Sequence, residues 1–143
     1  MKKLTGGCHC GNIRVAARLS RLAETYNPRA CDCEFCVKHV AAYVSDEQGS
    51  LLIRIKSEHD SVRYRQGSKA AEFLLCKACG VLVAVLYQAR GRIYAALNAR
   101  TVDETASFGA DQPISPKLLS EDERVARWRE VWFSDVEIDH GAA

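Results

Sequence analysis

The chain has 143 residues, of which 48% are hydrophobic and 27% are charged. This composition is typical of a globular domain and excludes disordered, collagen-like and coiled-coil classes. A single domain of this length, residues 1–143, buries roughly 68% of the surface that its unfolded chain exposes, so small size alone does not make a metal necessary. The formal charge of +2, without basic clusters interleaved with aromatic residues, gives no reason to expect a nucleic-acid partner.

Neither a secretory signal nor a membrane span is visible in the sequence. The first residues, MKKLTGGCHCG, contain no apolar run of the length that a signal peptide needs. No later stretch approaches the ~18 apolar residues of a membrane-spanning helix. We therefore expect a cytoplasmic protein without a membrane partner. The sequence does not indicate the oligomeric state.

The first two-thirds of the chain is predicted to form short strands separated by turns. Apolar residues alternate with polar ones at Ile13 and Val15, at Leu51, Ile53 and Ile55, and at Val62 and Tyr64. Such alternation is typical of half-buried strands. The segments AEFLL and VLVAVLY flank CKACG and predict a hairpin, and Gly91 turns the chain into a further strand. We expect a mainly β fold of short antiparallel strands.

One short helix is predicted near the C-terminus. Ser120 followed by Glu123 has the spacing of a capping box, in which each side chain binds a free backbone amide at a helix start. Val125, Trp128 and Trp132 then recur at helical intervals on one face. We expect the tryptophans to pack the helix on the sheet, which the pattern favours over a cofactor-stacking role.

Seven cysteines fall into three short clusters. They are Cys8 and Cys10 in GGCHCG, then Cys31, Cys33 and Cys36 in CDCEFC, then Cys76 and Cys79 in CKACG. The number is odd, and residues two apart on a strand lie ~6.6 Å apart, near the upper limit for a disulfide. In a reducing compartment, such clusters indicate metal binding or catalysis.

Two of the clusters are suited to a closed zinc site. Cys76-X-X-Cys79 followed by Gly80 has the form of a zinc knuckle, because a tight turn brings both sulfurs onto one ion and glycine permits the backbone conformation that follows. Cys8 and Cys10 present their sulfurs on one side of a strand and can supply the second pair. Such a site would tie the N-terminus to a distant hairpin, so we expect it to stabilise the fold.

The middle triplet is left for a second zinc ion. Three thiolates and Zn²⁺ carry a net charge of −1, which suits a soft fourth ligand such as a substrate thiol. That thiol could lose its proton and remain a nucleophile near neutral pH. The triplet could instead be a structural site completed by the chain itself, and spacing alone does not decide between the two. The candidates for that fourth ligand are Asp32, His39 and His9.

Three other side chains near the triplet are candidates for a part in the chemistry. Lys38 could stabilise an anionic thiolate site, and His39 could move a proton, although a solvated pair after a metal loop is an equally good interpretation. Tyr43 could donate a hydrogen bond to an aldehyde oxygen, but its place in AAYVS favours packing in a strand.

GGCHCG, CDCEFC and CKACG, in this order over about residues 5 to 100, resemble the glutathione-dependent formaldehyde-activating family, to which the centromere protein V domain is related. The resemblance implies a β-tent fold. It also implies a structural zinc on the first and last cysteine pairs and a second zinc on the triplet. After the triplet, however, VKHVAAYVSD differs from the arginine and glycine found in many relatives.

For the activity, the resemblance implies a carbon–sulfur lyase that reversibly joins a thiol, by default glutathione, to an aldehyde such as formaldehyde. Its partners would then be small molecules. The alternative is a zinc-stabilised binding module in which both zinc sites are structural. A metal or redox sensor built on the triplet is a third hypothesis.

Overall fold

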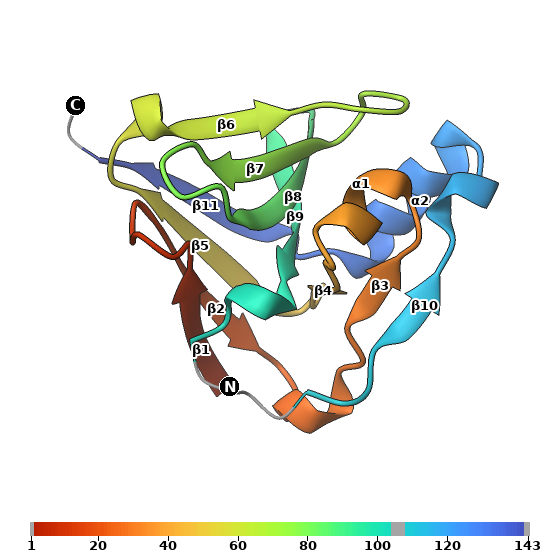
Figure 1. Ribbon diagram of the computed structural model, residues 1–143. Helices are drawn as coiled ribbons and strands as arrows, with labels where there is room; N and C mark the ends of the chain where they lie inside the picture. Colours follow the sequence, from red (N-terminus) through yellow and green to blue (C-terminus); the bar gives the residue numbers. More distant parts are fainter. Residues whose placement is uncertain (1, 104–107, 142–143) are drawn as a thin grey trace.

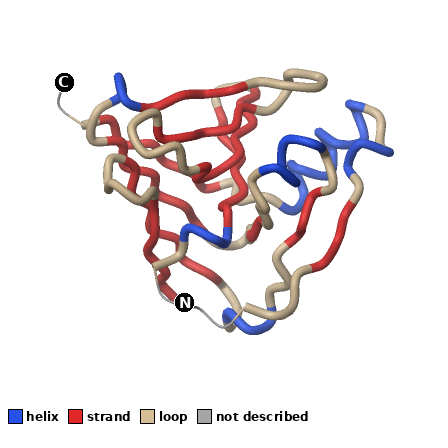
Figure 2. The backbone as a smooth tube through the Cα atoms, in the orientation of Figure 1, coloured by secondary structure: helices blue, strands red, loops and turns tan. Residues whose placement is uncertain are grey.

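The computed structural model describes residues 2–103 and 108–141, and these form two β-sheets with short helices at their edges (Figures 1 and 2). The first sheet has the strand order β1-β2-β5-β11. Its strands are β1 (Lys2–Gly7), β2 (Ile13–Leu19), β5 (Ser50–Ile55) and β11 (Asp135–His140). The strands predicted around Ile13 and Leu51 are thus confirmed, and they pair with each other in antiparallel fashion.

The second sheet has the strand order β10-β3-β4-β9-β8-β7-β6. Its strands are β3 (Arg29–Cys31), β4 (Tyr43–Val44), β6 (Ser61–Tyr64), β7 (Glu72–Cys76), β8 (Leu82–Ala89), β9 (Arg92–Asn98) and β10 (Gln112–Ile114). The hairpin predicted around CKACG is the β7–β8 pair. The strand after Gly91 is β9, which pairs with β8.

Two strand pairs depart from the expected antiparallel arrangement. β10 lies parallel to β3, with Ile114 opposite Cys31, and β11 lies parallel to β5. In each pair the two strands are far apart in the sequence, and parallel pairing requires such a long connection. Alternation of apolar residues reports which face of a strand is buried, not the direction of its neighbour, so the sequence carried no signal for these pairs.

The second sheet is buried on both faces. One face packs against the first sheet around a core of aliphatic residues. These include Leu4, Ile13, Val15, Leu51, Ile53, Leu74, Val83, Leu86 and Leu97, with Phe133. The opposite face carries a second core that includes Tyr43, Phe73, Val85 and Trp132. Because successive side chains of a strand point to opposite faces, Val85 and Leu86 of β8 join different cores.

Two α-helices lie together beside the second core, next to β3 and β10 (Figure 1). They are α1 (Glu34–Lys38) and α2 (Glu121–Val131), and four short 3₁₀ turns span Ala23–Thr25, Glu58–Asp60, Ala99–Thr101 and Pro116–Leu118. The capping box of α2 is confirmed: the Ser120 hydroxyl accepts from the Glu123 amide, and the Glu123 carboxylate accepts from the Ser120 amide. α1 was not predicted.

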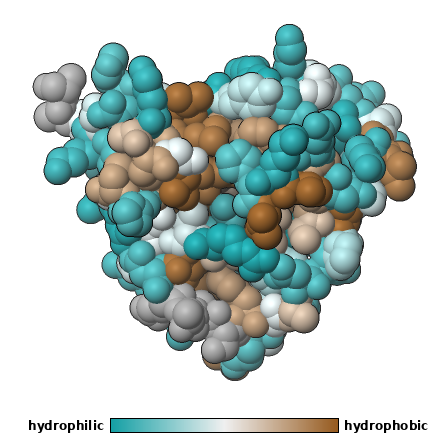
Figure 3. All heavy atoms as spheres, viewed as in Figure 1, coloured by the Kyte–Doolittle hydropathy of each residue, from teal (hydrophilic) through white to brown (hydrophobic). Residues whose placement is uncertain are grey.

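The mainly β fold with a short C-terminal helix is confirmed. On the face seen in Figure 3 most side chains are hydrophilic, with smaller apolar patches between them. No helix in the described residues is long and apolar enough to cross a membrane.

Candidate metal centres and a cavity

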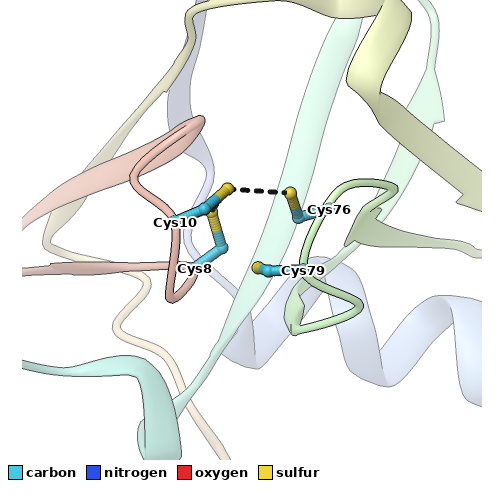
Figure 4. A group of neighbouring side chains, drawn as sticks. All are labelled: Cys8, Cys10, Cys76 and Cys79. Carbon is cyan, nitrogen blue, oxygen red and sulfur yellow. Dashed lines mark hydrogen bonds between the residues drawn. The ribbon is translucent and has the colours of Figure 1, made fainter.

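Cys8, Cys10, Cys76 and Cys79 come together although Cys10 and Cys76 are 66 positions apart in the sequence. The first pair lies on the turn after β1, and the second lies where β7 turns into β8. All four sulfurs lie within 4.8 Å of one another and point toward a common centre (Figure 4). The structure therefore brings together the four residues predicted for a closed metal site.

The spacing of these sulfurs fits a tetrahedral zinc ion. Zn–S bonds of about 2.3 Å place the sulfurs of a tetrahedral site about 3.8 Å apart. Here the sulfur of Cys10 lies 3.8 Å from that of Cys8 and 3.5 Å from that of Cys76. A disulfide would need about 2.05 Å, and all seven cysteines are free. An all-sulfur donor set with this spacing could hold zinc.

The local backbone holds the four cysteines of this group in position. Gly80 has a φ of +80°, which a side chain would disfavour, and its amide donates to the Cys76 carbonyl (2.8 Å), closing the turn. The Ile13 amide donates to the sulfur of Cys8 (3.2 Å). Burial raises the pKa of Cys76 to about 12. Burial also acts to raise the pKa of Cys79, but hydrogen bonds from the backbone amides of Cys10 and Val81 outweigh it, and the pKa is about 6.

Cys31, Cys33 and Cys36 form a second group, whose sulfurs also lie within 4.8 Å of one another. Cys31 ends β3, Cys33 is the N-cap of α1, and Cys36 lies buried within α1. The Cys36 amide donates to the sulfur of Cys33 (3.4 Å). The hydrogen bond from the Cys36 thiol lowers the pKa of Cys31 to about 6. The triplet thus favours one thiolate near neutral pH, a charge suited to a metal cation.

Within residues 2–103 and 108–141, no histidine, carboxylate or further cysteine joins the triplet as a fourth donor. One carboxylate oxygen of Asp32, Oδ2, accepts from Ser115 and pairs with Lys117 at 3.8 Å, two residues that follow β10. The His39 ring packs on Phe35 with 4.6 Å between ring centroids. His9 is exposed. The three side chains considered as completing ligands are therefore engaged or located elsewhere.

The triplet opens onto a cavity of about 220 Å³ between the second core and the two helices. Its walls are largely apolar and come from many elements, including β3, α1, β7, β8 and α2. The main apolar residues are Phe73, Val85, Trp128, Val131 and Trp132. The two tryptophan rings stack on each other with centroids 4.8 Å apart. Trp132 packs in the second core as predicted, and both rings also line the cavity.

Basic side chains also line this cavity. They are Arg29, Lys117, Arg124 and Arg127. Arg29 is held in place because its Nη2 donates to the Ser45 hydroxyl (2.6 Å), which in turn donates to the Val131 carbonyl (2.7 Å). Burial, followed by the nearby positive charge of Arg127, lowers the pKa of Arg29 to about 10. Arg29 therefore remains charged at neutral pH.

Tyr43 lies in the cavity wall, opposite Arg29 in the β3–β4 pair. Its hydroxyl is 3.2 Å from the sulfur of Cys36. Burial raises the pKa of Tyr43 far above its ordinary value, so the hydroxyl keeps its proton at neutral pH. Lys38 and His39 are not among the residues that line the cavity, and Lys38 is exposed. The positive charge expected from Lys38 comes instead from β3, from α2 and from Lys117.

Several residues of the cavity wall were not predicted from the sequence. For Arg29 a signal existed: residues two apart on a strand face the same side, so Arg29 shares the cavity side of β3 with Cys31. For Arg124 and Arg127 there was no comparable signal, because they lie on a helix more than 80 residues from the triplet. Only the folded chain places α2 over the cysteines.

The fold and these two groups define a mainly β protein with two cysteine centres fit for metal, one closed and one open to a cavity. The family model for the glutathione-dependent formaldehyde-activating enzyme matches residues 3–117. The chain belongs to this family.

Comparison with solved structures supports the fold. The crystal structure of a Rhodobacter sphaeroides protein superimposes with a TM-score of 0.53 and is 19% identical, covering 71% of this chain and 90% of that one. At this identity the likeness concerns the fold alone. No curated protein sequence matches the chain.

Proposed function

We propose that this protein reversibly joins a thiol to a small aldehyde, giving an S-hydroxyalkyl adduct, and that it is a zinc-dependent carbon–sulfur lyase. One observation carries the proposal: three cysteine sulfurs meet at the wall of a cavity, and no fourth donor from the described residues completes their group. The family supports an aldehyde-activating role. Glutathione and formaldehyde are the default substrate pair that follows from the family description.

The two cysteine groups would have different tasks. Cys8, Cys10, Cys76 and Cys79 would hold a structural zinc that joins the β1–β2 turn to the β7–β8 turn. Cys31, Cys33 and Cys36 would hold the second zinc. Bound there, zinc would supply a Lewis acid that favours the thiolate form of an incoming thiol at neutral pH.

The chemistry to be served is a reversible addition. The thiol sulfur forms a bond to the carbonyl carbon, the electron pair of the C=O π bond moves to oxygen, and the proton lost by the thiol ends on that oxygen. The reverse reaction breaks the C–S bond and returns the proton. Arg29 lines the same cavity as the triplet, so its positive charge would stabilise both the thiolate and the developing alkoxide. Tyr43 would hold the Cys36 sulfur in place.

The proposal is tested by the rate of adduct exchange, because thiols also add to aldehydes without a catalyst. Exchange NMR with ¹³C-formaldehyde and glutathione measures how fast the label moves between free and thiol-bound forms. We expect the protein to accelerate this exchange, Cys36→Ser to abolish the acceleration, and Arg18→Gln, an exposed change on β2, to leave it intact. A protein with both metals bound that accelerates exchange for no thiol would instead support the binding-module hypothesis.

A further inference from the structure

The cavity is much larger than its default aldehyde requires. A water-sized molecule needs about 10–15 Å³ of cavity volume, and formaldehyde has only two heavy atoms. The cavity of about 220 Å³ exceeds that need more than tenfold. Its aromatic and aliphatic walls, including Phe73, Trp128 and Trp132, are suited to the body of an apolar ligand. Glutathione, a polar peptide, offers no such body.

The same cavity carries an excess of positive charge. Of its four basic side chains, only Lys117 has a carboxylate partner within the described part of the chain, namely Asp32. Three thiolates with a divalent ion add one negative charge, which leaves cationic groups uncompensated. Arg29 is fixed through Ser45, so its guanidinium is already ordered before a ligand arrives. Ordered guanidinium groups bind carboxylates through paired, charge-assisted hydrogen bonds.

One part of this wall lies outside the part of the chain that matches the family. The match ends at residue 117, whereas Arg124, Arg127, Trp128 and Trp132 belong to α2 and its C-cap. Two of the cavity's four basic side chains and both of its tryptophans therefore come from a segment that the family description does not cover. Ligand selection here follows from this chain's own residues.

We propose that the cavity binds a small carboxylic acid with an aromatic or branched aliphatic body, in preference to glutathione or formaldehyde alone. The apolar body lies against Trp128 and Trp132, and the carboxylate pairs with Arg29 and Arg127. The remaining end of the ligand faces the three cysteines and carries the reactive group. This inference rests on the proposed function only for the identity of that group, a thiol or an aldehyde.

Binding can be measured without any turnover. The chain has two tryptophans, and both line the cavity, so intrinsic fluorescence reports on this site. The metal-loaded protein is titrated with 3-phenylpropanoate, with the neutral 3-phenylpropanol, with acetate and with glutathione. We expect saturable binding of 3-phenylpropanoate that is at least about tenfold tighter than that of the other three, because only it offers both an apolar body and a carboxylate.

Matched variants then test the placement of the carboxylate. Arg29→Gln and Arg127→Gln should each weaken 3-phenylpropanoate binding by about tenfold and leave the alcohol unaffected. Arg18→Gln, exposed on the other sheet, is the control and should bind as the unchanged protein does. Equal binding of acid and alcohol, or no effect of either cavity variant, would overturn the proposal.

The reactive end is identified by two further probes. If a 2-sulfanyl derivative of 3-phenylpropanoate binds more tightly than 3-phenylpropanoate itself, the carboxylic acid is the thiol substrate. If 4-formylbenzoate binds more tightly than benzoate, the carboxylic acid is the aldehyde substrate. If neither probe gains affinity, the reactive end does not face the cysteines and that part of the proposal fails. Because 3-phenylpropanoate carries no reactive group, its binding stands or falls independently of the lyase activity.

Discussion

The hydroxyl of Tyr43 lies 3.2 Å from the sulfur of Cys36, and both side chains are buried. This contact joins β4 of the second sheet to α1 and so fixes one member of the triplet against the wall of the cavity. When a bound metal deprotonates Cys36, the Tyr43 hydroxyl, which keeps its proton, can donate to the resulting thiolate and lower the energy of the charged sulfur.

Tyr43→Phe removes this donor and keeps the ring. We expect the variant to fold with a loss of about 1 kcal/mol in the free energy of unfolding, and to bind zinc more weakly at the triplet alone. Competition with a chromophoric chelator measures both affinities. Tyr64→Phe, on an exposed tyrosine of β6, is the control. Unchanged affinity in Tyr43→Phe would show that the contact does not support metal binding.

The two metal centres should respond differently to the same substitution. Cys76 and Cys36 are equally buried, at 1% and 2% exposure, so Cys→Ser costs similar packing at both. Cys76→Ser should severely destabilise the domain, because it breaks the group that links the two sheets' turns. Cys36→Ser should leave a folded protein. Thermal unfolding that shows equal damage would mean that the triplet is structural too.

Metal removal should also occur in two steps. Four fixed sulfurs are expected to hold zinc more tightly than three with an exchangeable fourth ligand. Mild chelation followed by metal analysis should show one ion lost while circular dichroism still reports a folded protein. Simultaneous loss of both ions, together with unfolding, would contradict an open site at the triplet.

Asp46 should make the free energy of unfolding depend on pH in the acidic range. Burial alone would raise its pKa, but hydrogen bonds donated by Tyr26, Ser20 and the Gln48 amide lower the pKa to about 2, below the ordinary 3.8. Since folding lowers this pKa, the stabilisation is fully present above about pH 4 and is lost as the pH falls toward 2.

Asp46→Asn should therefore reduce the free energy of unfolding by on the order of 2 kcal/mol at pH 7. The difference from the unchanged protein should shrink as the pH falls below 4. Urea unfolding of both proteins across this range measures it, and protonation of the cysteines cancels in the comparison. A difference that stays constant down to pH 2 would rule out the carboxylate as its source.

The sequence was most informative where local chemistry repeats. Alternating residues located β2, β5 and β6, the spacing of Ser120 and Glu123 located the start of α2, and cysteine spacing divided the seven thiols as the structure does. Each of these signals lies within a few residues. Such a signal indicates that one face of a strand is buried or that a backbone amide needs a hydrogen-bond acceptor. Both conditions depend on residues that are close together in the sequence.

The cavity could not be predicted from the sequence, because it is formed by contacts between segments that are far apart in the chain. The tryptophan stripe of α2 indicated a buried face but not that Cys31 and Arg29 lie opposite it. The parallel β3–β10 pair, which carries Pro116 and Lys117 to the cavity edge, joins segments about 80 residues apart. Lys38 and Arg29 each lie two residues from the triplet along the chain, yet only Arg29 lines the cavity.

Cobalt substitution tests the open triplet most directly, because sulfur-to-cobalt charge-transfer absorption counts thiolate ligands. With both sites loaded, we expect one cobalt ion, at Cys8, Cys10, Cys76 and Cys79, to be insensitive to added thiol. The other, at Cys31, Cys33 and Cys36, should gain absorption from a fourth sulfur as one equivalent of thiol binds, and Cys36→Ser should lose this response. A spectrum that no thiol changes, with the triplet's fourth position filled by a group of the chain itself, would contradict the account.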